Sequence, residues 1–356
     1  MEENQLRQKG KKVVVGLSGG VDSSVTAAIL KGQGYDVRAV FLLLWNEDEK
    51  KNSNSLADAK KVAQLLEIDL EIIDVRDKFL KEVVGYFLEE YKRGRTPNPC
   101  IFCNENLKFK VLFRELEKVS GDFVATGHYA RIIMEHEKYK LLQAKDNKKD
   151  QSYFLYRLNQ ERLSKLLFPI GEYEKLEIRK MAEKFGLPVF DKDESQNICF
   201  LSDDNVNRFI REKISMKEGD IIDQNGRKIG KHCGLSLYTL GQRKGINIGG
   251  TGPYYVYAKD YEKNVLSVTN NPLDNNLHTN RILLEKVSWV SDEKITPMRV
   301  LVKTRYQQKA AYAIINRDKG GYFIVFEKPE KLVAPGQSVV FYSGEQEVLG
   351  GGIVKK

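Results

Sequence analysis

A turn rich in glycine and serine, Ser18–Ser23 (SGGVDS), follows the apolar run Lys12–Gly16 and precedes a helix-like stretch. Its glycines let the backbone approach an anion closely, and its amides, with the positive end of the following helix, can bind phosphate oxygens. Its serines add hydroxyl donors, and Asp22 is a candidate ligand for Mg²⁺ bound to those phosphates. The string is neither a Walker A loop nor the glycine fingerprint of dinucleotide sites. It predicts a nucleotide phosphate site, with an ordinary capped turn before a helix as the alternative.

Four cysteines are the second source of chemistry. Cys100 and Cys103 form a CxxC pair next to two prolines, Cys199 lies in ESQNICFL, and Cys233 lies in KHCGL. The prolines predict that the CxxC pair lies in a rigid loop rather than in a helix. Four cysteines in 356 residues are too few for a secreted disulfide scaffold, so buried, catalytic or metal-binding roles are expected.

Several kinds of cysteine chemistry compete. A zinc site lacks a second ligand pair at normal spacing, a thioredoxin-like pair needs another fold context, and buried inert thiols are common. An iron–sulfur cluster needs three or four thiolates, which Cys100, Cys103 and Cys199 could supply if the fold brings them together. Sulfur transfer fits best, because one thiolate can carry a terminal sulfur as a persulfide and a second can release it by forming a disulfide. That route requires two cysteines that are distant in sequence and close in space.

Alternating strand and helix patterns must position these groups. Apolar runs predict strands at 12–16, 38–45, 69–75 and near 123–126, and amphipathic patterns predict helices at 25–30 and 56–68. This order predicts a doubly wound α/β domain with a parallel sheet. Two later stretches, 153–158 and 175–189, also have helical patterns, and Pro188 is expected to end the second.

The pattern changes after about residue 205 to short alternating runs rich in Val, Ile, Tyr and Thr. Asn225–Gly226 is a hairpin signal, and the polar segment 270–280 is a candidate linker. The sequence therefore predicts a doubly wound α/β domain at 1–204, a small β-rich central domain at 205–278 and a C-terminal β-barrel at 279–356.

Charge follows the same division. Residues 1–204 carry 34 Lys and Arg against 34 Asp and Glu, whereas residues 205–356 carry 24 against 15, so the whole excess of +9 lies in the second part. That asymmetry suggests a polyanionic partner bound partly by the C-terminal portion, with ordinary surface charge as an equal alternative. No apolar run is long enough to span a bilayer and the N-terminus lacks a signal-peptide pattern, so a cytoplasmic protein with no membrane partner is expected.

The motifs together carry a resemblance. The string SGGVDS resembles the PP-loop of the ATP pyrophosphatase superfamily. With GRTPNPCIFCNENLKF, ATGHYAR, KKDQSYFL, ESQNICFL, LGQRKG, KTRY and APGQSVVFY, the chain resembles the tRNA-specific 2-thiouridylases nearly end to end. The resemblance implies that ATP adenylates O2 of the wobble uridine of tRNA and that persulfide sulfur then replaces this oxygen, releasing AMP and pyrophosphate. It also implies two partners, tRNA and a sulfur-donor protein.

Site residues carried over by this resemblance fall into three groups. Cys103 matches the nucleophile and Cys199 the persulfide carrier. ATP-binding positions are Gly16, Leu17, Ser18, Gly19, Gly20, Val21, Asp22, Ser23, Leu42 and Gly127, where Leu42 stands in place of the usual methionine. Positions facing the target base are Asn98, Pro99 and Cys100, the last often an aspartate in the family. Positions facing the tRNA are His128, Lys149, Asp150, Gln151, Arg305, Tyr306 and Gln337.

Two other functions remain open at this stage. One is a different PP-loop tRNA-modifying enzyme, such as a lysidine synthetase, against which the distant cysteines argue. The other is a non-catalytic tRNA-binding or sulfur-relay protein, against which the intact SGGVDS string argues. Detection of 2-thiouridine and AMP after incubation with ATP, a sulfur donor and unmodified tRNA separates all three.

The charge distribution generates a first prediction. Affinity for tRNA should fall steeply with salt, because the positive excess lies in residues 205–356 and binding releases counterions from phosphates. Arg305→Ala should weaken binding and flatten the dependence of log Kd on log salt in filter-binding titrations. Binding of tRNA by a chain of residues 1–204 as tightly as by the full chain would contradict this division of labour.

Overall fold

The computed structural model describes residues 9–45, 49–193, 198–201, 205–246, 248–249, 253–292, 296–344 and 346–355. Two sequence-based predictions fall partly on other residues. Glu194–Asn197, the first half of the ESQNICFL motif, and the predicted boundary at residue 204 lie outside the described residues. The boundaries at 204 and 278 stay predictions.

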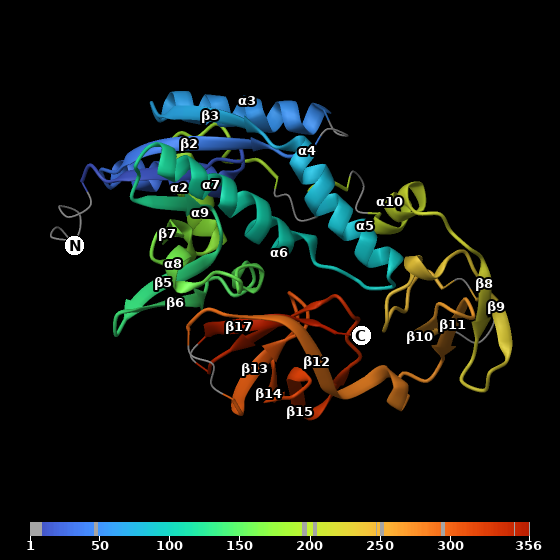
Figure 1. Cartoon of the computed structure of the whole chain (residues 1–356). Coiled ribbons are helices and arrows are strands. Elements are labelled where there is room, and N and C mark those ends of the chain that lie inside the picture. The colour runs from blue at the N-terminus through green and yellow to red at the C-terminus, as the bar shows by residue number, and fades with distance from the viewer. Residues whose placement is uncertain are drawn as a thin grey trace.

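A five-stranded parallel sheet forms the first part of the molecule (Figure 1). Its order is β3-β2-β1-β4-β7, and all four pairings are parallel. The strands are β1 (Lys12–Gly16), β2 (Asp36–Leu43), β3 (Asp69–Asp74), β4 (Phe123–Thr126) and β7 (Leu166–Leu167). The first four confirm the predicted strands, and β1 lies inside the sheet because its valines are buried on both faces.

Helices cover both faces of this sheet. Alternate residues of β1 point to opposite faces, so Val13 and Val15 pack with α2, whereas Val14 packs with α7. The doubly wound architecture is therefore confirmed.

The longer helices are α2 (Val21–Gly32), α3 (Glu49–Leu65), α5 (Gly85–Lys92), α7 (Phe109–Lys118) and α9 (Lys175–Lys184). The short ones are α4 (Arg76–Lys78), α6 (Pro99–Cys103), α8 (Gln160–Leu163), the 3₁₀ turns η3 (Ser152–Phe154) and η4 (Pro169–Glu172), and two π-helical segments, η1 (Phe79–Val84) and η2 (Asn104–Lys108).

Three local predictions were wrong. The CxxC pair lies on α6 and not in a loop, because Pro99 occupies the first helical turn, where its missing N–H costs nothing. The stretch 153–158 forms only the turn η3 and its continuation. Helix α9 ends before Gly186 rather than at Pro188: Gly186 has φ +65°, and the amide of Leu187 donates to the Ala182 carbonyl, a glycine-based C-terminal cap.

The central part is a four-stranded sheet in the order β10-β11-β8-β9. Its strands are β8 (Gly219–Ile222), β9 (Lys228–His232), β10 (Tyr255–Asp260) and β11 (Val265–Thr269). Gly226, with φ +75°, lies in the turn between β8 and β9, so the predicted hairpin is confirmed. A helix that the sequence reading did not predict, α10 (Val206–Lys213), precedes the sheet, while η5 (Leu235–Leu237) and η6 (Asn275–Leu277) are short 3₁₀ turns.

The C-terminal part is a closed β-barrel. Strands β12 to β17 follow the order β12-β15-β14-β13-β16-β17, and β12 also pairs with β17, which closes the sheet. The strands are β12 (His278–Trp289), β13 (Met298–Lys303), β14 (Ala311–Asp318), β15 (Gly321–Lys331), β16 (Ser338–Tyr342) and β17 (Glu347–Val354). The predicted barrel is confirmed, with an interior of buried aliphatic and aromatic side chains.

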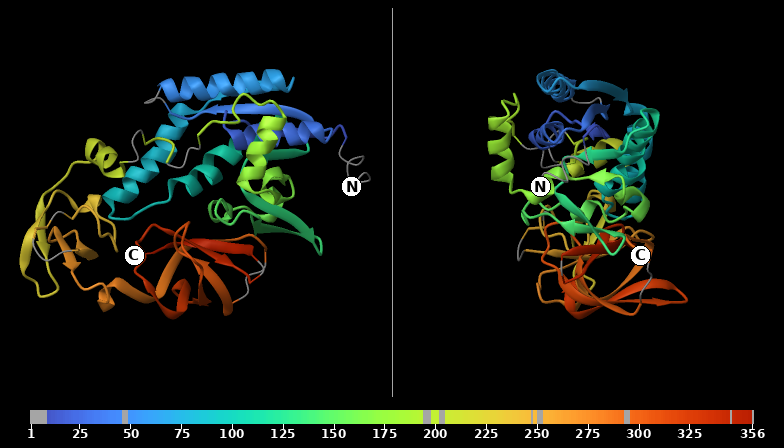
Figure 2. Two further views of the ribbon diagram at one scale, coloured as in Figure 1. Left: turned by 180° about the vertical axis from the view of Figure 1, so that it is seen from behind. Right: turned by 90° about the vertical axis from the view of Figure 1, so that its left-hand side faces the viewer.

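A hairpin from the first part joins the barrel. Strands β5 (Ala130–Glu135) and β6 (Lys138–Gln143) extend the barrel sheet, because β6 pairs with β17. A hydrogen bond joins the same two parts: the Tyr153 hydroxyl of the first part donates to the Ser338 carbonyl of β16 at 2.8 Å. Figure 2 shows the first part resting on the barrel, with the central sheet to one side. Among the helices described, none is long and apolar enough to cross a membrane.

The contact between the first part and the barrel generates a second prediction. A Cβ atom at Gly351 would lie 2.6 Å from the Val339 carbonyl oxygen and 2.7 Å from the ring of Tyr156. Gly351→Ala should therefore lower the free energy of unfolding by about 1–3 kcal/mol, measured by urea denaturation. Gly344→Ala is the matched control, because its Cβ would meet no atom within 4 Å. Equal stability of the two variants would contradict the prediction.

Candidate functional site

The predicted phosphate loop lies where β1 ends and α2 begins. Gly19 has φ +74°, and a Cβ atom there would lie 2.1 Å from the Ser55 carbonyl oxygen, so both its conformation and its surroundings require glycine. The Ser18 amide donates to the Ser23 hydroxyl at 3.1 Å, and the two serine hydroxyls are 3.0 Å apart. Gly20 is the N-cap of α2 and brings no side chain to cap the first-turn amides, which leaves that role to a bound anion.

Two lysines that the sequence analysis missed face this loop. Lys175, buried at the start of α9, pairs with Asp22 at 2.7 Å, and the Tyr129 hydroxyl donates to the same carboxylate oxygen at 2.8 Å. Lys192 donates to the Gly19 carbonyl at 3.0 Å and pairs with Asp58. Both cations come from chain far beyond the loop and resemble surface charges in the sequence, so no spacing signal could have found them.

The end of β4 lies against the first turn of α2. A Cβ atom at Gly127 would lie 2.7 Å from the Ser23 nitrogen and 2.8 Å from the Asp22 carbonyl carbon. Gly127, predicted from resemblance as an ATP contact, therefore touches the phosphate loop directly. Leu42, the other predicted contact outside the loop, lies on β2, the neighbour of β1, and packs partly buried against two core clusters.

The structure brings three of the four cysteines together. Cys103 is buried on α6, Cys100 lies half-buried one turn before it, and Cys199 is exposed, yet all three act electrostatically on the same side chain, Lys108. Cys103 and Lys108 are five residues apart across the π-helical segment η2, whose i to i+5 turn places such a pair on one face. The sequence analysis did not identify Lys108, because it expected the CxxC pair in a loop, where a spacing of five residues has no structural meaning.

None of the four cysteines, all of which lie in the described part of the chain, is in a disulfide, and Cys233 lies apart, after β9 in the central part. Burial raises the pKa of Cys103 to about 12 and also raises the pKa of Cys100, while the nearby Lys108 opposes both shifts. Burial lowers the pKa of Lys108, and its electrostatic interaction with the three cysteines raises that pKa. The second effect prevails, so the pKa of Lys108 lies above its ordinary value. Burial thus favours the protonated forms of Cys100 and Cys103, and Lys108 is the neighbouring group that favours a thiolate.

His128 links the phosphate loop to the thiols. It follows Gly127, it lies within the electrostatic reach of Lys108, and its Nδ1 is 2.7 Å from the Thr126 hydroxyl. Its ring lies between Phe109 and Phe168, with both centroids 5.9 Å away. Burial, with Lys108 second, lowers the pKa of His128 to about 3, so the imidazole is neutral at physiological pH.

Three of the predicted tRNA-facing residues, Arg305, Tyr306 and Gln337, make separate contacts. Tyr306 packs on Phe154 with ring centroids 4.6 Å apart, and Asn98 bonds the neighbouring Tyr153. Arg305 reaches the central part, since a Cβ atom at Gly241 in the LGQRKG motif would lie 3.5 Å from its guanidinium. Gln337 donates to the Thr96 carbonyl at 2.8 Å, just ahead of the CxxC pair.

The loop that holds Lys149, Asp150 and Gln151 is internally bonded. Asp150 is buried and accepts hydrogen bonds from Gln143, Ala144 and Ser152, and Lys303 lies 3.8 Å away. The Gln151 amide donates to the Tyr129 carbonyl, and its side chain accepts from the Tyr129 amide. The carboxylate of Asp150 therefore shapes this loop from inside, and its tRNA contact stays a prediction.

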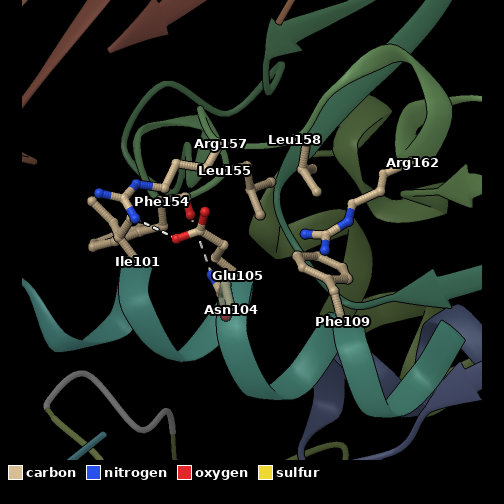
Figure 3. A pocket seen from close by; sticks show the side chains of 9 residues that line it. All are labelled: Ile101, Asn104, Glu105, Phe109, Phe154, Leu155, Arg157, Leu158 and Arg162. Atoms are coloured by element: carbon tan, nitrogen blue, oxygen red, sulfur yellow. Dashed lines mark hydrogen bonds and ion pairs between the residues drawn. The ribbon is translucent and has the colours of Figure 1, made fainter. Parts of the chain in front are cut away.

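A small pocket lies on another side of α6 and η2, lined by Ile101, Asn104, Glu105, Phe109, Phe154, Leu155, Arg157, Leu158 and Arg162 (Figure 3). Arg157 forms an ion pair with Glu105 inside it, so the charge of that arginine is matched within the protein. The pocket does not include the cysteines, and we assign no chemistry to it.

Within the described ranges, no group of three or more His, Cys, Asp or Glu side chains gathers closely enough to hold a metal ion. The arrangement of Cys100, Cys103 and Cys199 thus does not fit a three-thiolate cluster. Asp22 offers one carboxylate beside the phosphate loop, which suits Mg²⁺ bound chiefly by phosphates, although Lys175 already pairs with it.

The parallel sheet and the glycine turn at the end of β1 define an α/β nucleotide-binding protein of the PP-loop type. Three family profiles match in order: the tRNA methyl transferase HUP domain at residues 11–203, the tRNA methyl transferase PRC-barrel domain at 207–270 and the aminomethyltransferase beta-barrel domain at 279–354. The chain belongs to the MnmA family of tRNA-specific 2-thiouridylases.

Curated relatives match over nearly their whole length. The tRNA-specific 2-thiouridylase MnmA of Idiomarina loihiensis is 42% identical, with 99% of this chain and 98% of the relative covered. The enzyme of the same name from Buchnera aphidicola is 40% identical, with 98% of each covered. Among solved structures, the U34-tRNA thiolase NcsA from Methanococcus maripaludis, with its [4Fe-4S] cluster, is 20% identical over 56% of this chain and 68% of that one, with a TM-score of 0.38.

The neutral, enclosed His128 generates a third prediction. Its pKa is about 3 in the folded protein and about 6.5 unfolded, so between these values the unfolded chain binds the extra proton. Its contribution to stability is complete above pH 6.5 and is lost as the pH falls towards 3. From pH 8 to pH 5, that loss should reach at most about 2 kcal/mol, because the ring keeps some solvent exposure.

Urea denaturation of the wild type and of His128→Gln at both pH values measures this contribution. Glutamine can keep a hydrogen bond to Thr126 but cannot titrate, so the variant should lose less stability on acidification than the wild type. Identical pH dependence of the two proteins would show that His128 is not buried in its neutral form.

Proposed function

We propose that this chain catalyses ATP-dependent 2-thiolation of the wobble uridine of tRNA. The observation that carries the proposal is the gathering of Cys100, Cys103 and Cys199 around Lys108, beside the Gly127–His128 turn that touches the phosphate loop. Adenylation and sulfur transfer need adjacent sites, because the activated base must meet sulfur before water does.

The first half-reaction uses the phosphate loop. The uridine O2 attacks the α-phosphorus of ATP, and the bond to the pyrophosphate oxygen breaks. Amides of the Gly16–Ser23 segment, Lys175 and Lys192 would bind the negative charge that builds on the leaving pyrophosphate. Asp22 would hold Mg²⁺ together with phosphate oxygens, and the ion would add further charge neutralisation.

The second half-reaction uses the thiols. The terminal sulfur of a Cys199 persulfide attacks C2 and displaces AMP, which leaves the base joined to Cys199 through a disulfide. The Cys103 thiolate then attacks the Cys199 sulfur, so that 2-thiouridine leaves and a Cys103–Cys199 disulfide forms. In this step the sulfane sulfur is reduced and the two cysteine thiols are oxidised. A dithiol reductant must then reduce the Cys103–Cys199 disulfide, and a sulfur-donor protein must supply a new persulfide sulfur to Cys199.

The tRNA contacts complete the proposal. A base in an anticodon loop must be splayed out before O2 and C2 can be reached, and the Phe154–Tyr306 pair near Asn98 offers aromatic surface for a displaced base. The positive excess of residues 205–356 would bind the tRNA backbone. A cytoplasmic location and the three-domain division at 204 and 278 belong to the same proposal.

The test is thiolation by purified protein with ATP, a persulfide-loaded sulfur donor, a dithiol reductant and unmodified tRNA. Nucleoside mass spectrometry should detect 2-thiouridine, and Cys103→Ser and Cys199→Ser should each reduce it to background while tRNA binding stays near the wild-type level. AMP release should survive better than thiolation in both variants, because the phosphate loop is unchanged.

Cys100→Ala is the third arm of this experiment and separates two chemistries. Two thiols suffice for the persulfide route, so iron-free Cys100→Ala should keep most of the activity. Activity only after anaerobic reconstitution with iron and sulfide, and lost in Cys100→Ala, would replace this route by a cluster-dependent one. More than residual turnover by either serine variant would also reject the persulfide route.

A further inference from the structure

The segment Gly94–Asn98 connects α5 to α6 and leads directly into the helix that carries Cys100 and Cys103. In Figure 1 it passes between the central sheet and the barrel. Both of these parts bond to it, so the position of the two thiols depends on contacts made far from them in the sequence. We call these residues the connecting segment.

The barrel holds the connecting segment by its backbone and by an ion pair. The Thr96 amide donates to the Pro335 carbonyl at 2.7 Å, and the Gln337 side chain donates to the Thr96 carbonyl at 2.8 Å. Gly336 has φ +90°, and a Cβ atom there would lie 3.0 Å from Arg95, so any other residue would be strained and tightly packed. Arg95 pairs with Glu90 on α5 and with Glu285 on β12.

The central part holds it mainly through one lysine. Lys259 on β10 donates to the Gly94 carbonyl at 2.9 Å and to the Tyr238 carbonyl at 2.8 Å. The ring of Tyr261 lies against Gly94, where a Cβ atom would come within 2.4 Å of it. The Thr239 and Thr96 hydroxyls are 3.2 Å apart. The segment is therefore fixed from two sides.

We propose that Lys259 is a positioning residue for the thiol pair: its ammonium fixes the Gly94 carbonyl and so sets where α6 begins. The proposal deepens the proposed function and rests on it for its catalytic consequence. Lys259 acts through the backbone and touches neither thiol. Hydrogen bonds from a charged donor to carbonyls are stronger than neutral ones, and Lys259 makes such a bond to the Gly94 carbonyl.

The placement of Lys259 supports a specific role. A half-buried ammonium loses solvation, and burial lowers the pKa of Lys259 to about 8. A neutral side chain such as methionine would fill the same space without that cost. The hydrogen bonds that the Lys259 ammonium donates to the Gly94 and Tyr238 carbonyls explain why a lysine stands at this position.

The experiment combines hydrogen–deuterium exchange with kinetics on full-length Lys259→Met. Exchange in peptides spanning residues 94–103 should be about tenfold faster or more, and exchange in the phosphate-loop peptide should stay unchanged. In the thiolation assay, kcat should fall about tenfold at saturating tRNA while KM for tRNA stays within about twofold, as expected for displaced thiols. Lys263→Met, an exposed lysine just after β10, is the matched control.

Each outcome decides the proposal. Unchanged exchange at 94–103 in folded Lys259→Met overturns it, and so does faster exchange throughout the chain, which would make Lys259 a general stability residue. If Lys259→Met does not fold, the shorter and uncharged Lys259→Gln takes its place; faster exchange at 94–103 is expected, and unchanged exchange there overturns the proposal. The exchange result does not need thiolation, so it stands even if the wild type makes no 2-thiouridine.

Discussion

The close approach of Gly127 to the first turn of α2 is the constraint on which the rest of the site depends. No side chain fits between this residue and the Ser23 amide. The contact places the end of β4 on the phosphate loop and sends the next residue, His128, towards Lys108 and the thiols. A nucleotide site and a sulfur site can then share one edge of the sheet, as the carboxyl ends of parallel strands allow.

The electrostatics of the thiol site differ from those of an exposed reactive cysteine. Burial keeps the Cys103 proton in place, and a neutral His128 adds no positive charge, so Lys108 alone among these neighbours favours the thiolate. A protected thiol resists oxidation and premature disulfide formation with Cys199. The cost is a higher barrier to ionisation of the Cys103 thiol.

The three parts of the chain meet at the connecting segment. Lys259 and Tyr261 come from the central part, and Gln337 comes from the loop before β16, yet each contacts Gly94 or Thr96, ahead of the CxxC helix. The β5–β6 hairpin extends the barrel sheet in the same way, which makes the first part and the barrel one hydrogen-bonded unit. The basic half of the protein is thereby coupled mechanically to the half that carries the chemistry.

The sequence alone determined the local features that carry their own signal. Buried valine runs define β1 and β2, Asn225–Gly226 marks a hairpin, and SGGVDS after a strand marks a phosphate loop, because each depends on neighbouring residues only. The motifs also identified the family. The sequence suggested the wrong state for the CxxC pair, since Pro99 excludes a helix interior but not a helix start. Only the tertiary structure decided which groups meet. Lys108 is brought to the side of Cys103 by a π-helical turn, Lys175 forms an ion pair with Asp22, and Lys259 donates a hydrogen bond to the Gly94 carbonyl. These contacts join residues whose types are common on protein surfaces, and their partners are fixed by how the sheet and barrel pack rather than by any spacing along the chain.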